Sequence, residues 1–163
     1  MSLLRLACVL TLAGWIGGLA VLGGVAAPTI FRVLEAHDPV GGRTTAGLVF
    51  GEIFQKFAHL SWGFGALLLA LLGARAALGP RPRRFGVRMW TVTAMLAASL
   101  ATSFFLAPRI TAIRNSTSGP VASLPDDDPR KGEYARLHAA SNGLMLLTIL
   151  AGIGLIWVEM KDH

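Results

Sequence analysis

Two histidines are the side chains with the clearest capacity for chemistry inside the apolar parts of this chain. His59 and His138 are the only histidines that fall within its apolar blocks. Neutral imidazole is a common ligand of haem iron and of transition-metal ions. If both side chains lie near the same membrane surface, the pair predicts a site for haem b or a metal ion. A hydrogen-bonded histidine at the membrane interface is the simpler interpretation of each, and it stays open.

Other residue patterns speak against catalysis. The sequence contains no nucleophile–base pair, no glycine-rich phosphate loop and no full set of metal ligands. Cys8 is the single cysteine, which excludes a disulfide within the chain and a site built from several thiolates. No acidic residue lies deep in an apolar block, so a proton or ion pathway lacks support. We therefore expect a protein that is not an enzyme.

Four apolar blocks must carry these residues. The chain has 163 residues, of which 53% are hydrophobic and 15% charged, whereas a soluble domain usually carries about 25% charge. Each block is long enough for a helix to cross the hydrocarbon core, which is roughly 30 Å thick, and a helix satisfies its own backbone hydrogen bonds in lipid. The sequence predicts one domain, residues 1–163. Its fold is an all-α, up-down, integral membrane four-helix bundle with helices at about 6–27, 53–78, 88–107 and 134–158.

The first and third apolar blocks end on the same short motif. Ala27-Pro28-Thr29-Ile30 closes the first block, and Ala107-Pro108-Arg109-Ile110 closes the third. We expect both helices to stop at these prolines. The repetition indicates two tandem helix pairs.

The distribution of charge predicts the topology. The formal net charge is +6, and five arginines with no acid lie in the short segment 75–88. This clustering is typical of a cytoplasmic loop between membrane helices and does not indicate binding to nucleic acid. We expect a multi-pass protein of the cell (inner) membrane with cytoplasmic N- and C-termini.

Small residues in the first block predict close helix packing. Gly14 and Gly18 are four residues apart, which lets another helix approach closely. That helix can belong to the same chain, to a second copy or to a larger membrane complex. Trp15 lies in the middle of the block, and we expect it to pack inside. Apart from the lipid bilayer, these are the partners that the sequence indicates.

Polar faces in the later blocks predict contacts between helices. The third block carries one such face: Thr91, Met95, Ser99 and Thr102. The fourth block carries another: His138, Ser141, Asn142 and Met145. Hydroxyls in membrane helices usually bond their own backbone or a neighbouring helix, and polar stripes usually face protein rather than lipid.

Charged residues near the block ends predict contacts at the interface. Glu52 and Lys56 are one turn apart and can pair there. Arg109 can reach toward the outer membrane surface. The run 126–128 of three aspartates indicates a solvated turn with the character of a helix start.

Several short motifs extend over nearly the whole chain. They are Trp15-Ile16-Gly17-Gly18, Ala27-Pro28-Thr29-Ile30-Phe31, Gly51-Glu52-Ile53-Phe54, Pro108-Arg109-Ile110 with Asn115, and Leu137-His138 with Ser141-Asn142. This set resembles the bacterial members of the transmembrane protein 205-like family. The resemblance implies a four-helix membrane protein without an assigned reaction. The candidate structural or interaction residues are Trp15, Gly14, Gly18, Pro28, Glu52, Pro108, Arg109 and Asn142.

Two functions follow as expectations. The first is a small accessory subunit or binding protein of the membrane, which works through its helix faces and loops. The alternative is a haem- or metal-binding redox protein that uses His59 and His138. A more distant similarity to membrane protoporphyrinogen oxidases implies an enzyme, but those oxidases use a histidine in their first helix, and this chain has none there.

Overall fold

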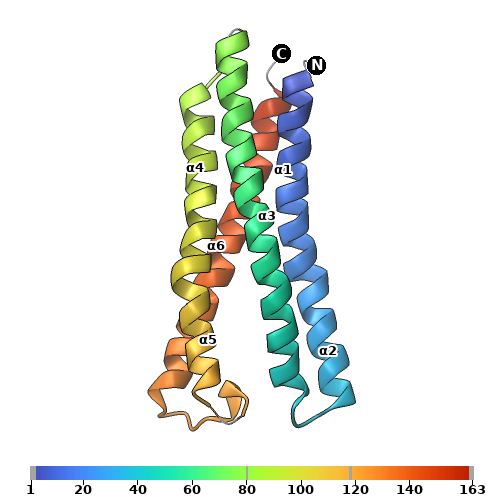
Figure 1. The fold of residues 1–163 in the computed structure, drawn as a ribbon, viewed down its shortest axis with the longest axis vertical. Helices are drawn as coiled ribbons and strands as arrows, with labels where there is room; N and C mark the ends of the chain where they lie inside the picture. The colour runs from blue at the N-terminus through green and yellow to red at the C-terminus, as the bar shows by residue number, and fades with distance from the viewer. Residues whose placement is uncertain (1–2, 80, 118, 162–163) are drawn as a thin grey trace.

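Four long helices form the whole architecture. The computed structural model describes residues 3–79, 81–117 and 119–161, and within these ranges every regular element is helical (Figure 1). The helices that are long and apolar enough to cross a membrane are Leu3–His37, Gly42–Leu78, Phe85–Asn115 and Pro129–Met160. Successive spans run in opposite directions (Figure 1). The prediction of an all-α, up-down membrane bundle is confirmed.

The first and third spans are each interrupted by a π-helix, whereas the second and fourth are continuous. The first span consists of α1 (Leu3–Val21), the π-helix η1 (Leu22–Ala26) and α2 (Ala27–His37). The third consists of α4 (Phe85–Ala101), the π-helix η2 (Thr102–Leu106) and α5 (Ala107–Asn115). The continuous helices are α3 (Gly42–Leu78) and α6 (Pro129–Met160), and the 3₁₀-helix η3 (Val121–Ser123) precedes α6.

The two prolines redirect hydrogen bonds without ending a helix, so the predicted ends at residues 27 and 107 are wrong. Pro28 lies just after η1, and the helix continues to His37. The Ala27 N–H donates to the carbonyl of Leu22, five residues back instead of four. This wider turn moves the preceding carbonyls away from the proline ring, so the helix continues past the proline. The same arrangement precedes Pro108.

The turn between α2 and α3 extends both helices beyond the apolar blocks. The Asp38 carboxylate accepts the backbone N–H groups of Val40 and Gly41, each at 3.0 Å. These hydrogen bonds, with Gly41 the stronger cause, lower the pKa of Asp38 below its ordinary value. Gly42 lies so close to the Leu34 backbone that a Cβ atom would collide with it. This close contact requires a glycine at the start of α3, which begins well before residue 53, where the predicted membrane-crossing helix starts.

An aspartate cap starts α6. Asp128 accepts the backbone N–H of Arg130 at 2.9 Å and pairs with its guanidinium at 2.7 Å. The Arg130 side chain, and after it the backbone N–H, lowers the pKa of Asp128, so this cap is ionised at neutral pH. The helix-start character predicted for residues 126–128 is confirmed. Because of the cap, α6 begins at Pro129 and not at the predicted residue 134.

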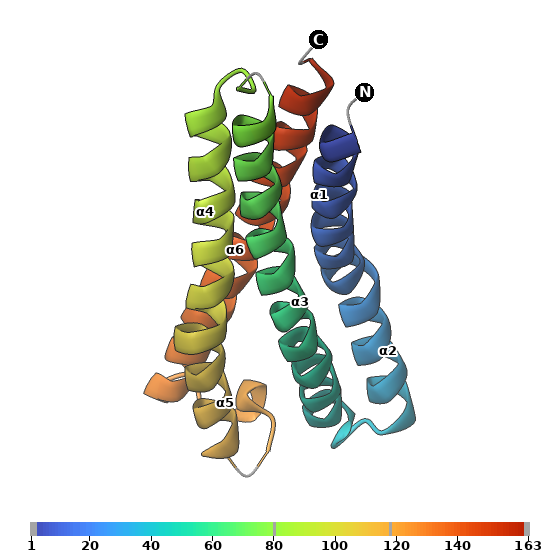
Figure 2. The ribbon, with the colours of Figure 1, turned by 45° about the horizontal axis from the view of Figure 1, so that its top comes forward.

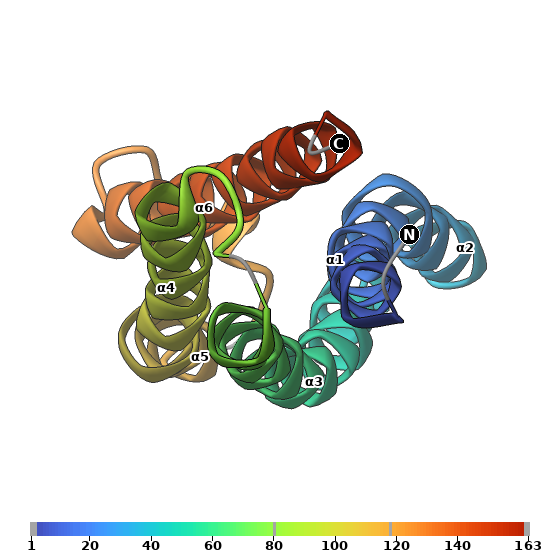
Figure 3. The same ribbon diagram turned by 90° about the horizontal axis from the view of Figure 1, so that it is seen from above.

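The four spans form a ring in the order α1, α3, α4, α6 when the molecule is viewed from above (Figure 3). The start of α1, the end of α6 and the α3–α4 connection lie together at what we call the terminal end (Figure 1). The other two connections lie at the opposite loop end. Toward the loop end, the α2–α3 pair diverges from the α5–α6 pair (Figure 2). Across this divergence, the Arg114 guanidinium donates to the Gly47 carbonyl at 2.9 Å.

Close helix contacts hold the core together. The central buried cluster draws on all four spans: Cys8, Leu12, Trp15, Ile16 and Leu19 from α1; Leu68 and Leu72 from α3; Val92 and Met95 from α4; and Leu155 from α6. Trp15 is fully buried, as predicted. Gly152 of α6 lies directly against Ile16 of α1, and the absence of a side chain permits this approach.

The glycines of α1 face α3 of the same chain. A Cβ atom on Gly14 would lie 3.5 Å from the Phe64 ring, and one on Gly18 would overlap the Phe57 ring. The interpretation of these two glycines as intrachain packing residues is therefore confirmed. Gly17, between them in sequence, has no such neighbour within 4 Å.

We expect Gly18→Ala to lower the free energy of unfolding by about 1–3 kcal/mol, because the added methyl group forces Phe57 out of a packed position. Gly17→Ala is the matched control, and it should leave stability unchanged or raise it slightly, since alanine has the higher helix propensity. Thermal unfolding in detergent measures both. Equal behaviour of the two variants would show that the α1–α3 contact is not tightly packed.

Candidate functional site

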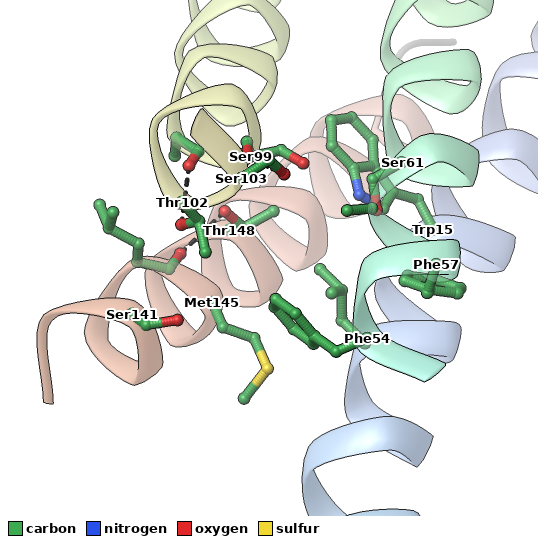
Figure 4. Close-up of a pocket in the computed structure, with 14 residues that line it drawn as sticks. Trp15, Phe54, Phe57, Ser61, Ser99, Thr102, Ser103, Ser141, Met145 and Thr148 are labelled. Carbon is green, nitrogen blue, oxygen red and sulfur yellow. Dashed lines mark hydrogen bonds between the residues drawn. The ribbon is translucent and has the colours of Figure 1, made fainter. Parts of the chain in front are cut away.

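A cavity inside the bundle is the main candidate for a functional site. It is partly open, and the roughly 390 Å³ of empty space within its outline includes the open space at its mouth. All four spans contribute to its wall (Figure 4). The lining residues are Trp15, Leu19, Phe54, Phe57, Ala58, Ser61, Ala98, Ser99, Thr102, Ser103, Ser141, Leu144, Met145 and Thr148.

The lining combines aromatic surface with hydroxyl groups and contains no charged residue. Several hydroxyls donate to the carbonyl four residues back in their own helix: Thr102 to Ala98 at 3.0 Å, Ser103 to Ser99 at 3.0 Å, and Thr148 to Leu144 at 2.8 Å (Figure 4). For these three residues the expectation that hydroxyls of the membrane helices bond their own backbone is confirmed. Their oxygen atoms keep lone pairs for a further hydrogen bond.

One wall of the cavity carries polar groups that lack partners. Trp15 is 0% exposed, and its indole nitrogen has no hydrogen-bond partner among the described residues. Ser61 is 2% exposed, and no hydrogen bond joins it to another residue in the described part of the chain. A buried donor without an acceptor is destabilising, so these groups call for an explanation.

The two histidines predicted as ligands lie outside this cavity. His59 is exposed on α3 and meets Trp62 edge-on, with ring centroids 4.8 Å apart. His138 is exposed on α6 and stacks on Tyr134 with ring centroids 6.0 Å apart. No group of three or more potential metal ligands occurs among the described residues. Haem or metal binding by these histidines stays a prediction, and this arrangement does not support it.

The predicted polar stripe of α6 is divided between two faces. Ser141 and Met145 line the cavity, as expected of side chains that face protein. His138 and Asn142 are exposed, so for them the prediction is wrong. Residues three or four apart can fall on either side of the boundary between a core face and a lipid face, and the sequence spacing alone does not locate that boundary.

The remaining predicted residues also lie away from the cavity. Exposed positions are occupied by Glu52, Pro28, Pro108 and Arg109. No ion pair joins Glu52 to Lys56 in the ranges that the structure describes. The polar face predicted for the third apolar block is confirmed at three of its four residues. Met95 is buried, and Ser99 and Thr102 line the cavity.

A buried cluster of charged residues, which the sequence pattern does not predict, closes the terminal end. The Glu159 side chain is 3% exposed and pairs with arginines from three helices. It bonds Arg75 of α3 at 2.8 Å, contacts Arg88 of α4, and lies 3.8 Å from the Arg5 Nε of α1. Arg5 also donates to the Glu159 backbone carbonyl. Glu159 therefore links all four spans.

A signal for this cluster exists in the spacing. On α6, Thr148, Gly152, Leu155 and Glu159 are separated by four, three and four residues, and all four are buried. This is the spacing of one helix face. Glu159 belongs to the same buried stripe as the core residues, whereas a purely compositional view assigns it to a solvated tail.

These features define the class: a multi-pass membrane protein built as an all-α bundle of four spans. The chain belongs to the family described as a domain of unknown function (DUF4149), whose profile matches residues 10–118. The matched region runs from α1 to the segment after α5, so Glu159 and the rest of α6 lie beyond it. No curated protein matches the chain, and no solved structure does.

We expect Glu159→Gln to lower the free energy of unfolding by about 3–5 kcal/mol, because the change leaves buried arginines without their shared carboxylate. Glu133→Gln, at an exposed position of the same helix, is the control and should have little effect. Chemical or thermal unfolding in detergent at neutral pH measures the difference. Similar stabilities would show that the charged cluster does not hold the spans together.

Proposed function

We propose that this chain is a small, non-enzymatic membrane protein that binds a lipid-soluble molecule in the cavity of its bundle. The observation that carries this proposal is the cavity itself. The cavity is partly open, and all four spans line it. Small-molecule sites are mostly apolar and aromatic with a few placed polar groups, and the lining has this composition.

The absence of charge in the lining restricts the ligand. All fourteen lining residues are neutral. A charged ligand in a low-dielectric site needs an opposite charge or many hydrogen bonds, because its desolvation is costly. The cavity therefore suits an uncharged molecule.

The depth of the cavity indicates where the ligand comes from. Thr148 of the lining and Glu159 of the cluster are eleven positions apart on α6, which corresponds to about 16 Å along a helix. Glu159 is the first charged residue after the apolar part of α6, so we place the edge of the hydrocarbon core at its level. The core is roughly 30 Å thick, and the cavity then lies near its middle. A molecule dissolved in the membrane interior reaches this level without crossing a polar layer.

The arrangement of the helices favours entry from the loop-end half. The charged cluster and the apolar core close the bundle on the terminal side of the cavity. Toward the loop end the two helix pairs diverge (Figure 2). The bond from Arg114 to Gly47 spans them there, and its opening would widen the way to the cavity.

The arginine-rich segment supports an orientation. Arg81, Arg83 and Arg84 are exposed at the terminal end. Clustered arginines are retained on the cytoplasmic side, which gives a cell-membrane protein with both termini inside. The more specific assignment to the bacterial transmembrane protein 205-like family agrees with the four spans and belongs to the same proposal.

An accessory role through a second copy or a partner subunit is the other candidate. One observation favours it: Gly17 and Gly24 of the first span have open space where a Cβ atom would stand. Small residues on an outer face let another helix pack closely. Such an interface would leave the cavity free, so the two roles are compatible.

Photolabelling with benzophenone tests the binding role. In lipid nanodiscs, we expect benzophenone to label Met145 in the cavity and Met160, which is 53% exposed on the outside of the bundle. Ala98→Phe fills the cavity and should abolish labelling of Met145 while it leaves that of Met160 unchanged. Peptide mass spectrometry measures both sites, and Ala98→Leu supplies a milder filling. If Met145 is labelled equally in the folded filled variants, the cavity does not bind the probe.

Maleimide accessibility tests the orientation. Cys8 is 1% exposed, so the natural chain offers a low background to a membrane-impermeant reagent. Arg83→Cys and Asp127→Cys place thiols at exposed positions of the terminal and loop ends. In intact cells we expect Asp127→Cys to react and Arg83→Cys to react only after the membrane is opened. The reverse pattern would invert the proposed topology.

A further inference from the structure

Two donors without partners lie on one wall of the cavity. The indole N–H of Trp15 is fully buried, and no described residue accepts it. Ser61 also lines this cavity and has no hydrogen bond within the described ranges. Trp15 belongs to α1 and Ser61 to α3, and these helices pack on each other (Figure 4).

An oxygen atom of a ligand could accept hydrogen bonds from both of these groups, the Trp15 indole and the Ser61 hydroxyl. An indole N–H only donates, and a serine hydroxyl can donate or accept. A carbonyl oxygen has two lone pairs, so it can accept from the indole and the hydroxyl together. On the opposite wall the protons of Thr102, Ser103 and Thr148 are used in their own helices (Figure 4). Ser99 and Ser141 keep free hydroxyl protons there among the described residues, but that wall has no indole N–H beside them.

We infer that Trp15 and Ser61 recognise the carbonyl oxygen of an uncharged, lipid-soluble ketone or quinone-like ring compound. This inference rests on the proposed binding function and names its ligand class. The rings of Trp15, Phe54 and Phe57 offer the aromatic surface that a flat compound packs against. Ester carbonyls of membrane lipids are a less suitable source, because they lie at the membrane surface and the cavity lies near mid-membrane.

Trp62 provides an internal control. Its indole nitrogen is also buried without a partner among the described residues, but Trp62 does not line the cavity. It stacks on Phe104 with ring centroids 5.3 Å apart. If loss of any buried indole N–H changes probe binding, Trp15→Phe and Trp62→Phe should have the same effect. If Trp15 recognises the ligand, only Trp15→Phe should change probe binding.

A matched probe pair tests the inference. Fluorenone carries a carbonyl, and fluorene has the same ring skeleton without it. In nanodiscs, with partition into protein-free discs subtracted, we expect the protein to favour fluorenone by at least about three- to tenfold, the usual value of a single hydrogen bond. Trp15→Phe and Ser61→Ala should each reduce the preference for fluorenone over fluorene, whereas Trp62→Phe should keep it.

A spectroscopic signal gives an independent readout. The carbonyl carbon of ¹³C-labelled fluorenone should resonate downfield of the lipid-dissolved compound when bound, and this shift should disappear in Trp15→Phe. Nanodiscs of ether-linked lipids, which lack ester carbonyls, should give the same occupancy. A rise in fluorenone occupancy in those discs would overturn the choice of a free compound over lipid esters.

The outcomes separate the inference from the proposed function. If both probes occupy the cavity equally and Trp15→Phe and Ser61→Ala change nothing, recognition of a carbonyl is wrong and the binding role stands. If neither probe occupies the cavity, as judged by protection of Met145 from benzophenone, both the inference and the proposed function fail.

Discussion

The shared carboxylate of Glu159 is the interaction on which the architecture depends. Three arginines from α1, α3 and α4 meet this one side chain at the terminal end. Buried charges in such a setting are costly unless they are paired, so the helices are held in the arrangement that pairs them. The charged cluster holds the helices together at the terminal end, and the two helix pairs diverge at the loop end. The cavity lies between these two parts of the bundle.

The buried face of each span changes character along its length. Along α4 and into η2 it passes from Arg88 through Val92 and Met95 to the hydroxyl of Thr102. The face of α6 runs from Glu159 through Leu155 to Thr148. Ionic contacts, apolar packing and a hydroxyl-lined cavity therefore form three successive layers from the terminal end. In all three layers the buried residues recur every three or four positions along one helix face. The chemistry of these side chains, charged, apolar or hydroxyl-bearing, distinguishes one layer from the next.

The sequence predicts the number of spans, the burial of Trp15 and the helix-start role of residues 126–128, because apolar length and capping chemistry are local properties. It does not predict that the helices pass through Pro28 and Pro108, since that depends on a shift of hydrogen bonds one turn earlier. It also overlooks Ser61 and Glu159, whose importance arises from side chains on other helices. His138 and Asn142 are the opposite case. Polar residues in a membrane helix are expected to face protein, but both of these side chains are exposed.

The π-turns before the two prolines have a consequence for how the halves of the molecule can vary. A wider turn accommodates one extra residue, and each residue of a helix turns the chain by about 100°. Loss of a single residue within Leu22–Ala26 or Thr102–Leu106 would leave an ordinary α-turn directly before the proline, and the proline ring would then collide with the carbonyl four residues back. Shortening of either turn therefore requires replacement of Pro28 or Pro108 as well, so each wide turn and its proline change as a pair.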